Sequence, residues 1–330
     1  PGILEARNAE LVALTARTPE RAEQLRRKHG AKRAYTSEEE LLRDPEVDAV
    51  YIATPVAEHY REGTLATQAG KHILMEKPLT VSADETKALI DCCEAHKVAF
   101  GAGFMMRFGT HVQSMRRAVL DGRIGTVLSG TANFTLWMPY QSGVWRLQKK
   151  NGGGALMDMG IHCLDLISFI TGMRVTEVAA MNENVLFRDP GYEVEDSSAV
   201  LLRMENGAQF FVQSSFNIPY AEAKWHLNLF GSKGRLMGDN ILGQEDTGTL
   251  NLIDADMLPT LDPRPQTGYG QGRMCPAVFG NLYTREIESF SESVLCGTPL
   301  EVPATQALEV QRVVDAAYRS SREKRIISLL

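Results

Sequence analysis

The sequence has no run of about 18 consecutive apolar residues, the length that a transmembrane helix needs. It also has no block of basic residues, because lysine and arginine are scattered along the chain and the formal net charge is -6. A basic surface is the usual electrostatic signature of proteins that bind nucleic acid or anionic membranes. We therefore expect neither a nucleic acid nor a membrane as a partner.

Cysteine is scarce, with five residues of which Cys92 and Cys93 are adjacent. This odd count argues against a disulfide framework and fits a reducing compartment, so we expect a cytoplasmic protein. No zinc spacing occurs, because both thiols and His96 are neighbours on one predicted helix, and no metal ion is expected. The sequence also lacks a Walker loop and a Gly-x-Ser-x-Gly elbow, which argues against a P-loop enzyme and a serine hydrolase.

What is present is an ordinary globular composition, with 44% hydrophobic and 23% charged residues over 330 positions. This length favours two domains, each with its own core. In residues 1–103 short apolar runs alternate with amphipathic stretches, which predicts an α/β domain with a Rossmann-type parallel sheet. The expected strands are 10–16, 48–53, 72–75 and 99–103, and the expected helices are 19–29, 37–43, 58–69 and 83–96.

Residues 104–330 predict a second, α+β domain with a large, mostly antiparallel sheet. The expected strands are 127–138, 175–185, 198–204, 209–216 and 225–230, and the expected helices are 111–121, 277–295 and 304–320. Residues 239–275 are rich in glycine, proline and aspartate, which indicates an irregular excursion over the surface. The last helix is a candidate to pack back on the first domain.

Two strand ends in the first domain carry candidate binding residues. A buried strand ends at Thr54-Pro55, and His59 lies on the following helix, whose free N–H groups can bind phosphate. Glu76-Lys77-Pro78 ends another strand, where the proline holds Lys77 extended and lets its ammonium reach a ribose hydroxyl or a substrate oxygen. Each motif has a structural alternative: a plain turn with a surface histidine, and a solvated Glu-Lys pair.

A third motif opens the second domain, where Gly152–Gly154 precede a helix with Asp158 and His162. Because these two are four residues apart, they share one helix face and can act on one small molecule. A carboxylate beside an imidazole raises its proton affinity, as acid-base chemistry on a hydroxyl or carbonyl requires. The alternative is that Asp158 caps the helix and His162 packs in the core.

The order of these motifs, with Arg107-Phe108 and Trp145-Arg146 between them, resembles the Gfo/Idh/MocA family of glucose-fructose and inositol oxidoreductases over essentially the whole sequence. The resemblance implies NAD or NADP as cofactor and a sugar, inositol or related polyol as substrate. It implies homodimers or homotetramers formed through the open sheet. Lys77, Asp158 and His162 would form the catalytic group and contact the substrate. The weaker candidates are the cofactor contacts Arg107, Trp145 and Arg146 and the substrate contact Tyr283.

One element of that family's pattern does not occur here. The Gly-x-Gly-x-x-Gly turn that cradles the pyrophosphate in Rossmann domains is absent from these 330 residues. Residues 1–4 look like the close of the helix after that turn. The resemblance therefore implies that roughly the first βα unit is missing from this sequence rather than from the working protein.

The choice of cofactor depends on Leu14–Thr18, at the end of the first predicted strand. Ala16 occupies the place of the acidic residue that binds the NAD ribose, and Arg17 follows it with a donor group suited to phosphate. We expect a preference for NADP, with Thr15 or Thr18 as a further hydroxyl contact. The alternative is that Arg17 stacks on the adenine or points to solvent.

These observations lead to the hypothesis of reversible hydride transfer between nicotinamide and a carbinol carbon. His162 would exchange a proton with the substrate hydroxyl, and Asp158 would orient or polarise this pair. Lys77 would bridge the nicotinamide ribose and the substrate oxygen. Two alternatives remain open: a glycosidase of the same fold that uses NAD only transiently, and a non-catalytic protein that binds a sugar or dinucleotide.

Overall fold

The computed structural model describes residues 1–219, 225–254 and 272–329. The chain divides into two compact units, and it passes between them more often than a single boundary near residue 103 would require. The first unit comprises Pro1–Met105, Lys150–Gly152 and Asn281–Gln311, and the second comprises Met106–Lys149, Gly153–Gly280 and Arg312–Leu330.

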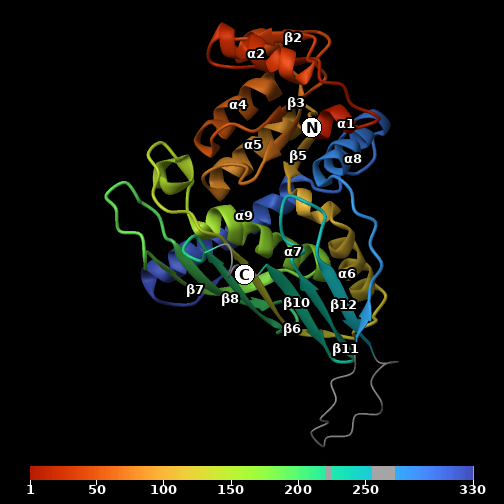
Figure 1. Cartoon of the computed structure of the whole chain (residues 1–330), viewed down its shortest axis with the longest axis vertical. Coiled ribbons are helices and arrows are strands. Elements are labelled where there is room, and N and C mark those ends of the chain that lie inside the picture. The colour runs from red at the N-terminus through yellow and green to blue at the C-terminus, as the bar shows by residue number, and fades with distance from the viewer. Residues whose placement is uncertain (220–224, 255–271, 330) are drawn as a thin grey trace, which may run out of the picture. The chain divides into compact units, whose positions relative to one another are not determined.

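The first unit contains two parallel sheets. Strands β1 (Ala13–Thr15) and β2 (Arg33–Tyr35) pair with each other, and β3 (Ala49–Ile52), β4 (His72–Glu76) and β5 (Phe100–Gly103) form a three-stranded sheet (Figure 1). The helices of this unit are α1 (Gly2–Glu5), α2 (Pro19–His29), α3 (Glu38–Leu42), α4 (Val56–Gln68), α5 (Ala83–Ala95) and α8 (Leu282–Cys296).

Local signals account for the helix bounds in this unit. The side chain of Thr18 accepts a hydrogen bond from the Arg21 N–H group, Pro19 occupies the first helical position, and Gly30 ends α2 with φ at 69°. The predicted bounds of α2 are therefore confirmed. Strand β2 was not predicted, because its three residues are too short for a periodic signal.

Helix α8 covers the three-stranded sheet although it lies far along the chain. Ile287 and Phe290 of α8 form a buried cluster with Leu74 of β4. A side-chain carbon at Gly101 of β5 would lie 2.9 Å from the Phe290 ring, so only glycine lets the helix approach this closely. The predicted helix 277–295 was too long at its start, because α8 begins at Leu282 with Asn281 as its cap.

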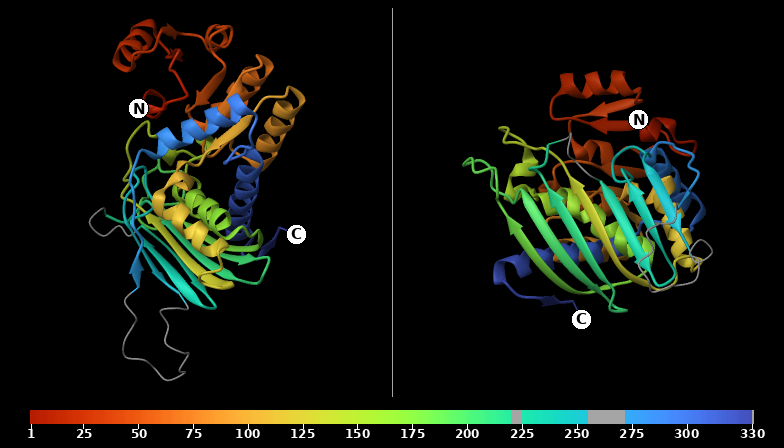
Figure 2. Two further views of the ribbon diagram at one scale, coloured as in Figure 1. Left: turned by 90° about the vertical axis from the view of Figure 1, so that its right-hand side faces the viewer. Right: turned by 60° about the horizontal axis from the view of Figure 1, so that its bottom comes forward.

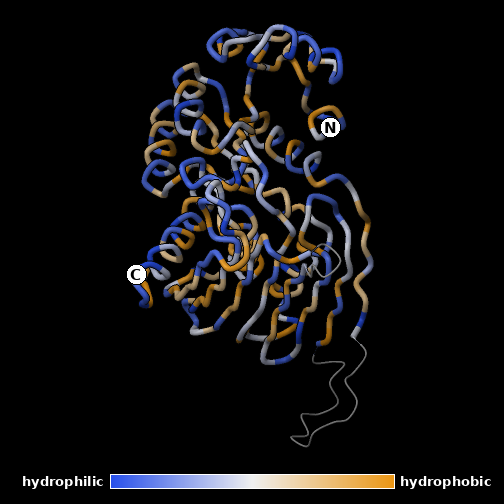
Figure 3. Tube along the Cα trace, turned by 60° about the vertical axis from the view of Figure 1, so that its left-hand side comes forward, coloured by the Kyte–Doolittle hydropathy of each residue, from blue (hydrophilic) through white to orange (hydrophobic). Residues whose placement is uncertain are grey.

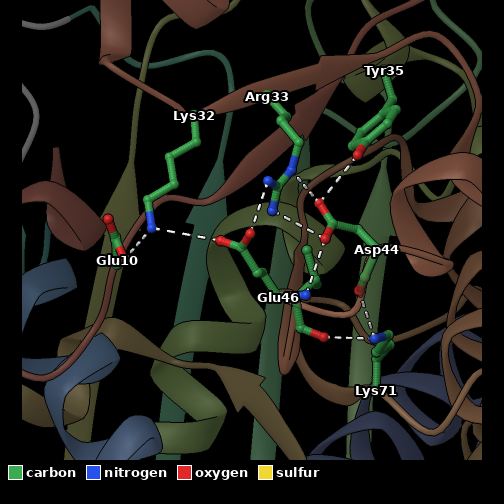
Figure 4. Close-up of polar contacts among 8 residues, drawn as sticks. Glu10, Lys32, Arg33, Tyr35, Asp44, Glu46 and Lys71 are labelled. Carbon is green, nitrogen blue, oxygen red and sulfur yellow. Dashed lines mark hydrogen bonds and ion pairs between the residues drawn. The ribbon is translucent and has the colours of Figure 1, made fainter.

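A charged network links the two sheets of the first unit (Figure 4). The buried carboxylate of Asp44 accepts hydrogen bonds from Arg33 of β2 at 2.6 and 3.0 Å and from the Tyr35 hydroxyl at 3.1 Å. Lys71, just before β4, donates to the backbone oxygens of Asp44 and Val47 at 3.0 and 2.7 Å. Burial raises the pKa of Asp44, but its hydrogen bonds outweigh this effect and hold the pKa below its usual range.

The second unit is built on one large sheet. Its strand order is β13-β12-β11-β10-β6-β9-β8-β7-β14, and all neighbours are antiparallel except β6 and β9. The strands are β6 (Val127–Thr135), β7 (Val175–Glu183), β8 (Ser197–Met204), β9 (Gln209–Ser215), β10 (His226–Gly231), β11 (Gly234–Asp239), β12 (Thr249–Ile253), β13 (Arg273–Met274) and β14 (Ile327–Ser328).

Strands β12 and β13 correct the sequence analysis, which treated residues 239–275 as one irregular excursion. Thr249–Ile253 pairs with β11 in a regular antiparallel register, and Arg273–Met274 pairs in turn with β12. Residues 255–271 of the same stretch lie outside the described residues. The apolar positions of β12 gave a signal that the surrounding glycines and aspartates obscured.

One face of this sheet is buried and the other is open. Along β8, Ser198, Val200, Leu202 and Met204 are buried, whereas the residues between them are at least partly exposed. In the right-hand view of Figure 2 one face of the sheet is turned to the viewer, and helices α6 (Thr110–Leu120) and α7 (Ile161–Thr171) lie on its other side. Hydrophobic and hydrophilic residues alternate along the strands (Figure 3). This is the pattern of a sheet with one covered face.

The most apolar helical stretch, Lys149–Thr171, contains α7. An 18-residue window of this stretch has a mean hydropathy of 1.3, so its length and composition would allow it to cross a membrane, but 94% of the window is buried inside the protein. Such burial is typical of the core helix of a globular protein. The last helix, α9 (Ala304–Glu323), begins in the first unit and ends in the second.

Candidate active site

In the first unit, His59 joins the two strand-end motifs. One ring nitrogen lies 2.8 Å from the Thr54 carbonyl oxygen, and the other lies 3.0 and 3.2 Å from the carbonyl oxygens of Pro78 and Leu79. The His59 side chain is only 1% exposed. Burial lowers the pKa of the imidazole, although the hydrogen bonds to backbone oxygens partly oppose this effect. His59 is therefore not a surface residue, and it connects the turn after β3 to the turn after β4.

The other polar groups at these strand ends are also held in place. Thr54 donates to the Glu62 carboxylate at 2.6 Å, and burial raises the pKa of Glu62 to about 7. Glu76 accepts a hydrogen bond from the Tyr51 hydroxyl and, at 3.2 Å, from the Lys77 backbone N–H group. The Glu-Lys pair is thus half-buried at the end of β4 rather than a solvated surface pair.

In the second unit, Asp158 lies on a wide helical turn, the π-helix η4 (Leu156–Gly160), which continues directly into α7. Such turns are rare, and they are frequently found at functional sites. The Asp158 carboxylate accepts a hydrogen bond from Arg146 at 3.0 Å, and the Arg146 guanidinium lies 4.6 Å from the Trp145 ring centre. The structure therefore brings Asp158, Arg146 and Trp145 together.

His162 follows on the first turn of α7. It is 3% exposed and meets the Phe134 ring edge-on, with the ring centres 6.2 Å apart. Phe134 belongs to β6, so the imidazole is placed by the covered face of the large sheet. Both Asp158 and His162 are buried, and their neighbours leave each side chain a narrow range of orientations.

Arg107, predicted as a cofactor contact, has protein partners in the second unit. Its guanidinium is 2% exposed, and its Nε atom donates to both carboxylate oxygens of Asp165 at 3.1 and 3.0 Å. The same guanidinium lies 4.8 Å from the Phe169 ring centre. These contacts are those of a structural ion pair under α7, since the charge is already neutralised inside the core.

The remaining predicted residues lie in the first unit. Arg17 is exposed just beyond β1, while the Thr18 hydroxyl is occupied as the cap of α2. Tyr283 is half-buried on the first turn of α8, where its Cβ and backbone lie against Gly2 of α1. Pro55 occupies the position before α4. Because proline has no side-chain oxygen, the first N–H groups of α4 receive no hydrogen bond from a capping side chain.

Sequence reasoning missed the residues that support the site. Asp165 pairs with an arginine 58 positions earlier, and Tyr51 contacts a glutamate 25 positions later. Asp165 lies three residues after His162 and seven after Asp158, so on a regular helix it shares their face, and an isolated charge in an apolar helix was the available signal. Among the described residues, no group of three or more His, Cys, Asp or Glu side chains is placed to hold a metal ion.

The family follows from comparison with known proteins. Residues 2–104 match the oxidoreductase family with an NAD-binding Rossmann fold, and residues 112–237 match the GFO/IDH/MocA C-terminal domain. A 1,5-anhydro-D-fructose reductase from Ensifer adhaerens is 31% identical over 89% of this chain and 83% of its own length. The chain belongs to the GFO/IDH/MocA family.

Two further relatives extend over nearly the whole chain. A D-xylose 1-dehydrogenase (NADP(+)) from Haloferax volcanii is 30% identical over 99% of this chain and 94% of its own length. The crystal structure of an aldose-aldose oxidoreductase from Caulobacter crescentus, complexed with glycerol, superimposes with a TM-score of 0.87 at 25% identity and covers 100% of this chain and 94% of that one.

Membership of the GFO/IDH/MocA family confirms several expectations from the sequence. The fold is a Rossmann-type domain followed by a domain with a large, mostly antiparallel sheet. The protein is an oxidoreductase that uses a nicotinamide dinucleotide. The named relatives are reductases and dehydrogenases, which disfavours the glycosidase alternative.

The Arg107–Asp165 pair leads to a test that separates structure from cofactor binding. We expect Asp165→Ala to lower the free energy of unfolding by about 3–5 kcal/mol, because it leaves a buried arginine without its counter-charge. Urea denaturation followed by circular dichroism measures this loss. The double variant Arg107→Met with Asp165→Leu should recover most of the stability and bind dinucleotide normally. A stable double variant with weakened dinucleotide binding would return Arg107 to the cofactor site.

Proposed function

We propose that this protein catalyses reversible hydride transfer between a nicotinamide dinucleotide and a carbinol or carbonyl carbon of a sugar, inositol or related polyol. The observation that carries the proposal is the pairing of Asp158 with Arg146 one helical turn before His162. A buried carboxylate and an imidazole on one helix are suited to move a proton at a substrate hydroxyl. The names of the relatives, which refer to anhydrofructose and xylose, support a polyol substrate.

The residues have distinct roles in this proposal. His162 accepts the hydroxyl proton in oxidation and returns it in reduction, while Asp158 orients the substrate hydroxyl and polarises the imidazole. The Lys77 ammonium stabilises the negative charge that develops on the substrate oxygen. The nicotinamide ring, when bound, takes up or returns the hydride.

The chemistry of the strand ends in the first unit fits a dinucleotide. Arg17 offers a guanidinium beyond β1, and α4 offers its first N–H groups after Pro55 without a side-chain cap. Glu76, Lys77 and Pro78 stand at the end of the neighbouring β4. We propose that the cofactor contacts of the first unit are Arg17, Thr54, Pro55 and Glu76–Pro78. Further candidates for contact with the cofactor or the substrate are Trp145, Arg146 and Tyr283.

We expect His162→Ala to lower kcat by about 10²- to 10⁴-fold, because acid-base catalysis commonly contributes that factor. Dinucleotide affinity should stay nearly unchanged, since the imidazole acts on the substrate. Steady-state kinetics with an identified polyol and a fluorescence titration of the dinucleotide measure the two effects. Lys77→Ala gives the contrast, because it should impair both substrate turnover and dinucleotide binding. Wild-type turnover in His162→Ala would contradict the role of the imidazole, and loss of fold would favour a core histidine.

The preference for NADP over NAD is a second part of the proposal. If the exposed Arg17 binds the 2′-phosphate of NADP, Arg17→Ala should weaken NADP binding by about 10- to 100-fold, the loss of a charge-assisted hydrogen bond. NAD binding should change much less. Parallel titration of both dinucleotides against the full-length wild type and the variant measures the difference. Tighter binding of NAD than of NADP by the wild type would contradict the preference.

We further propose that two or four copies assemble through the open face of the large sheet. On this face Leu201 of β8 and Phe211 of β9 stand opposite each other in register and are 54% and 39% exposed. Adjacent exposed apolar side chains on a sheet are typical of an interface. Five free cysteines, two of them buried, support our proposal that the assembly works in the reducing cytoplasm.

Leu201→Lys combined with Phe211→Lys should break this assembly, because charges would have to be buried between copies. Size-exclusion chromatography with light scattering should show a shift to a smaller species at micromolar concentration. Leu120→Lys is the matched control, since Leu120 is an apolar residue of α6 that is 64% exposed. An unchanged mass in the double variant, or the same shift in Leu120→Lys, would exclude this face as the interface.

A further inference from the structure

The helical segment that carries Asp158 and His162 begins without a local cap. Its first N–H groups are instead satisfied by Glu195, which lies 39 positions beyond Leu156. The Leu156 N–H group donates to the Glu195 Oε1 atom at 2.9 Å, and the Ala155 N–H group donates to the Glu195 backbone oxygen at 3.3 Å. One residue outside the helix therefore binds two successive amides of its first turn.

The same carboxylate is held from its other side by α9. The Tyr318 hydroxyl donates to Glu195 Oε1 at 2.9 Å, and the Met157 backbone is a further hydrogen-bond partner of that hydroxyl. Burial raises the pKa of Tyr318 well above its usual range, so the hydroxyl keeps its proton and stays a donor. Glu195 and Tyr318 thus connect α9 to the turn that precedes Asp158.

Gly154 leaves the space that these two side chains fill. A carbon added at Gly154 would lie 2.6 and 2.8 Å from the Glu195 carboxylate oxygens and 2.7 Å from the Tyr318 hydroxyl oxygen. Its φ of 127° is also a conformation that other residues rarely adopt. The Gly154 oxygen accepts from the Asp158 N–H group at 2.9 Å, and its own N–H group donates to the Arg146 oxygen at 3.0 Å.

We propose that Glu195 and Tyr318 act as positioning residues that hold the turn at Gly154–Leu156 and so set the positions of Asp158 and His162. The proposal rests on the proposed function of those two residues. The turn at Gly154 bonds the backbones of both Asp158 and Arg146, whose side chains form an ion pair. A shift in this turn therefore moves both members of the pair, and a displacement of about 1 Å at a catalytic group can cost about 100-fold in rate.

The character of Glu195 suggests which substitutions are informative. Burial raises the pKa of this carboxyl to about 7, and the nearby charge of Asp196 raises it further. The hydrogen bonds from the Leu156 N–H group, the Glu195 backbone and Tyr318 lower the pKa but do not outweigh burial. A glutamine side chain at this position is neutral, like the protonated form of Glu195, and it can still accept a hydrogen bond. Glu195→Gln keeps the acceptor oxygen, Glu195→Leu removes it with little change in size, and Tyr318→Phe removes only the donor.

The experiment compares amide hydrogen exchange and steady-state kinetics in the whole protein. In Glu195→Leu we expect exchange at residues 155–158 to accelerate about 10-fold or more, because a part-buried hydrogen-bond acceptor is lost. We expect kcat to fall about 10- to 100-fold while the Kd for the dinucleotide stays unchanged. Glu195→Gln should restore most of both properties, and Tyr318→Phe should fall between. Glu205→Leu, at an exposed glutamate that pairs with Arg174 near the β8–β9 hairpin, is the matched control.

The outcome of these measurements decides whether Glu195 and Tyr318 position the catalytic residues. Unchanged exchange at 155–158 in Glu195→Leu, or faster exchange with wild-type kcat, overturns the proposal. If Glu195→Leu does not fold, the same two measurements on Tyr318→Phe decide it. If the wild type turns over no polyol, the proposed function has failed, and exchange alone then shows whether Glu195 and Tyr318 hold this turn.

Discussion

The helical segment 156–171 lies buried against the large sheet, and its burial requires that its polar groups find partners there. Buried backbone N–H groups and buried charges are costly unless they are paired. In this segment Glu195 binds the first amides, and Arg107 neutralises Asp165 farther along. Because these partners come from distant parts of the second unit, the helix can take only one register on the sheet, and Asp158 and His162 are positioned as a consequence.

The same constraint organises the first unit. In this unit two buried polar side chains, His59 and Asp44, bind segments that are far apart in the sequence. His59 binds the turns after β3 and β4, while the Asp44 carboxylate binds β2 and the Asp44 backbone oxygen accepts a hydrogen bond from Lys71 just before β4. Exposed groups of the same unit, such as Arg17 beyond β1, are carried by this framework. Rigid scaffolds of this kind let nearby loops carry binding residues.

Two candidate site residues, Arg107 and His59, also support the fold around the site. Arg107 and His59 carry chemistry that suits a cofactor, and both stand beside motifs of the site in the sequence. Both are nearly fully buried and bonded to the protein itself. A polar residue beside a functional motif therefore has two physical readings, contact with the ligand or support of the contact, and burial distinguishes them.

The sequence by itself determined the elements that depend on neighbours along the chain. Periodicity placed most strands and helices, Thr18 and Gly30 set the ends of α2, and the spacing of Asp158 and His162 placed both on one helical segment. Only the tertiary structure decided which distant side chain meets which, as in Arg107 with Asp165, Glu195 with Leu156, and α8 with the three-stranded sheet. The physical reason is that such contacts depend on the packing of whole elements, which leaves no periodic or local signal at the residues involved.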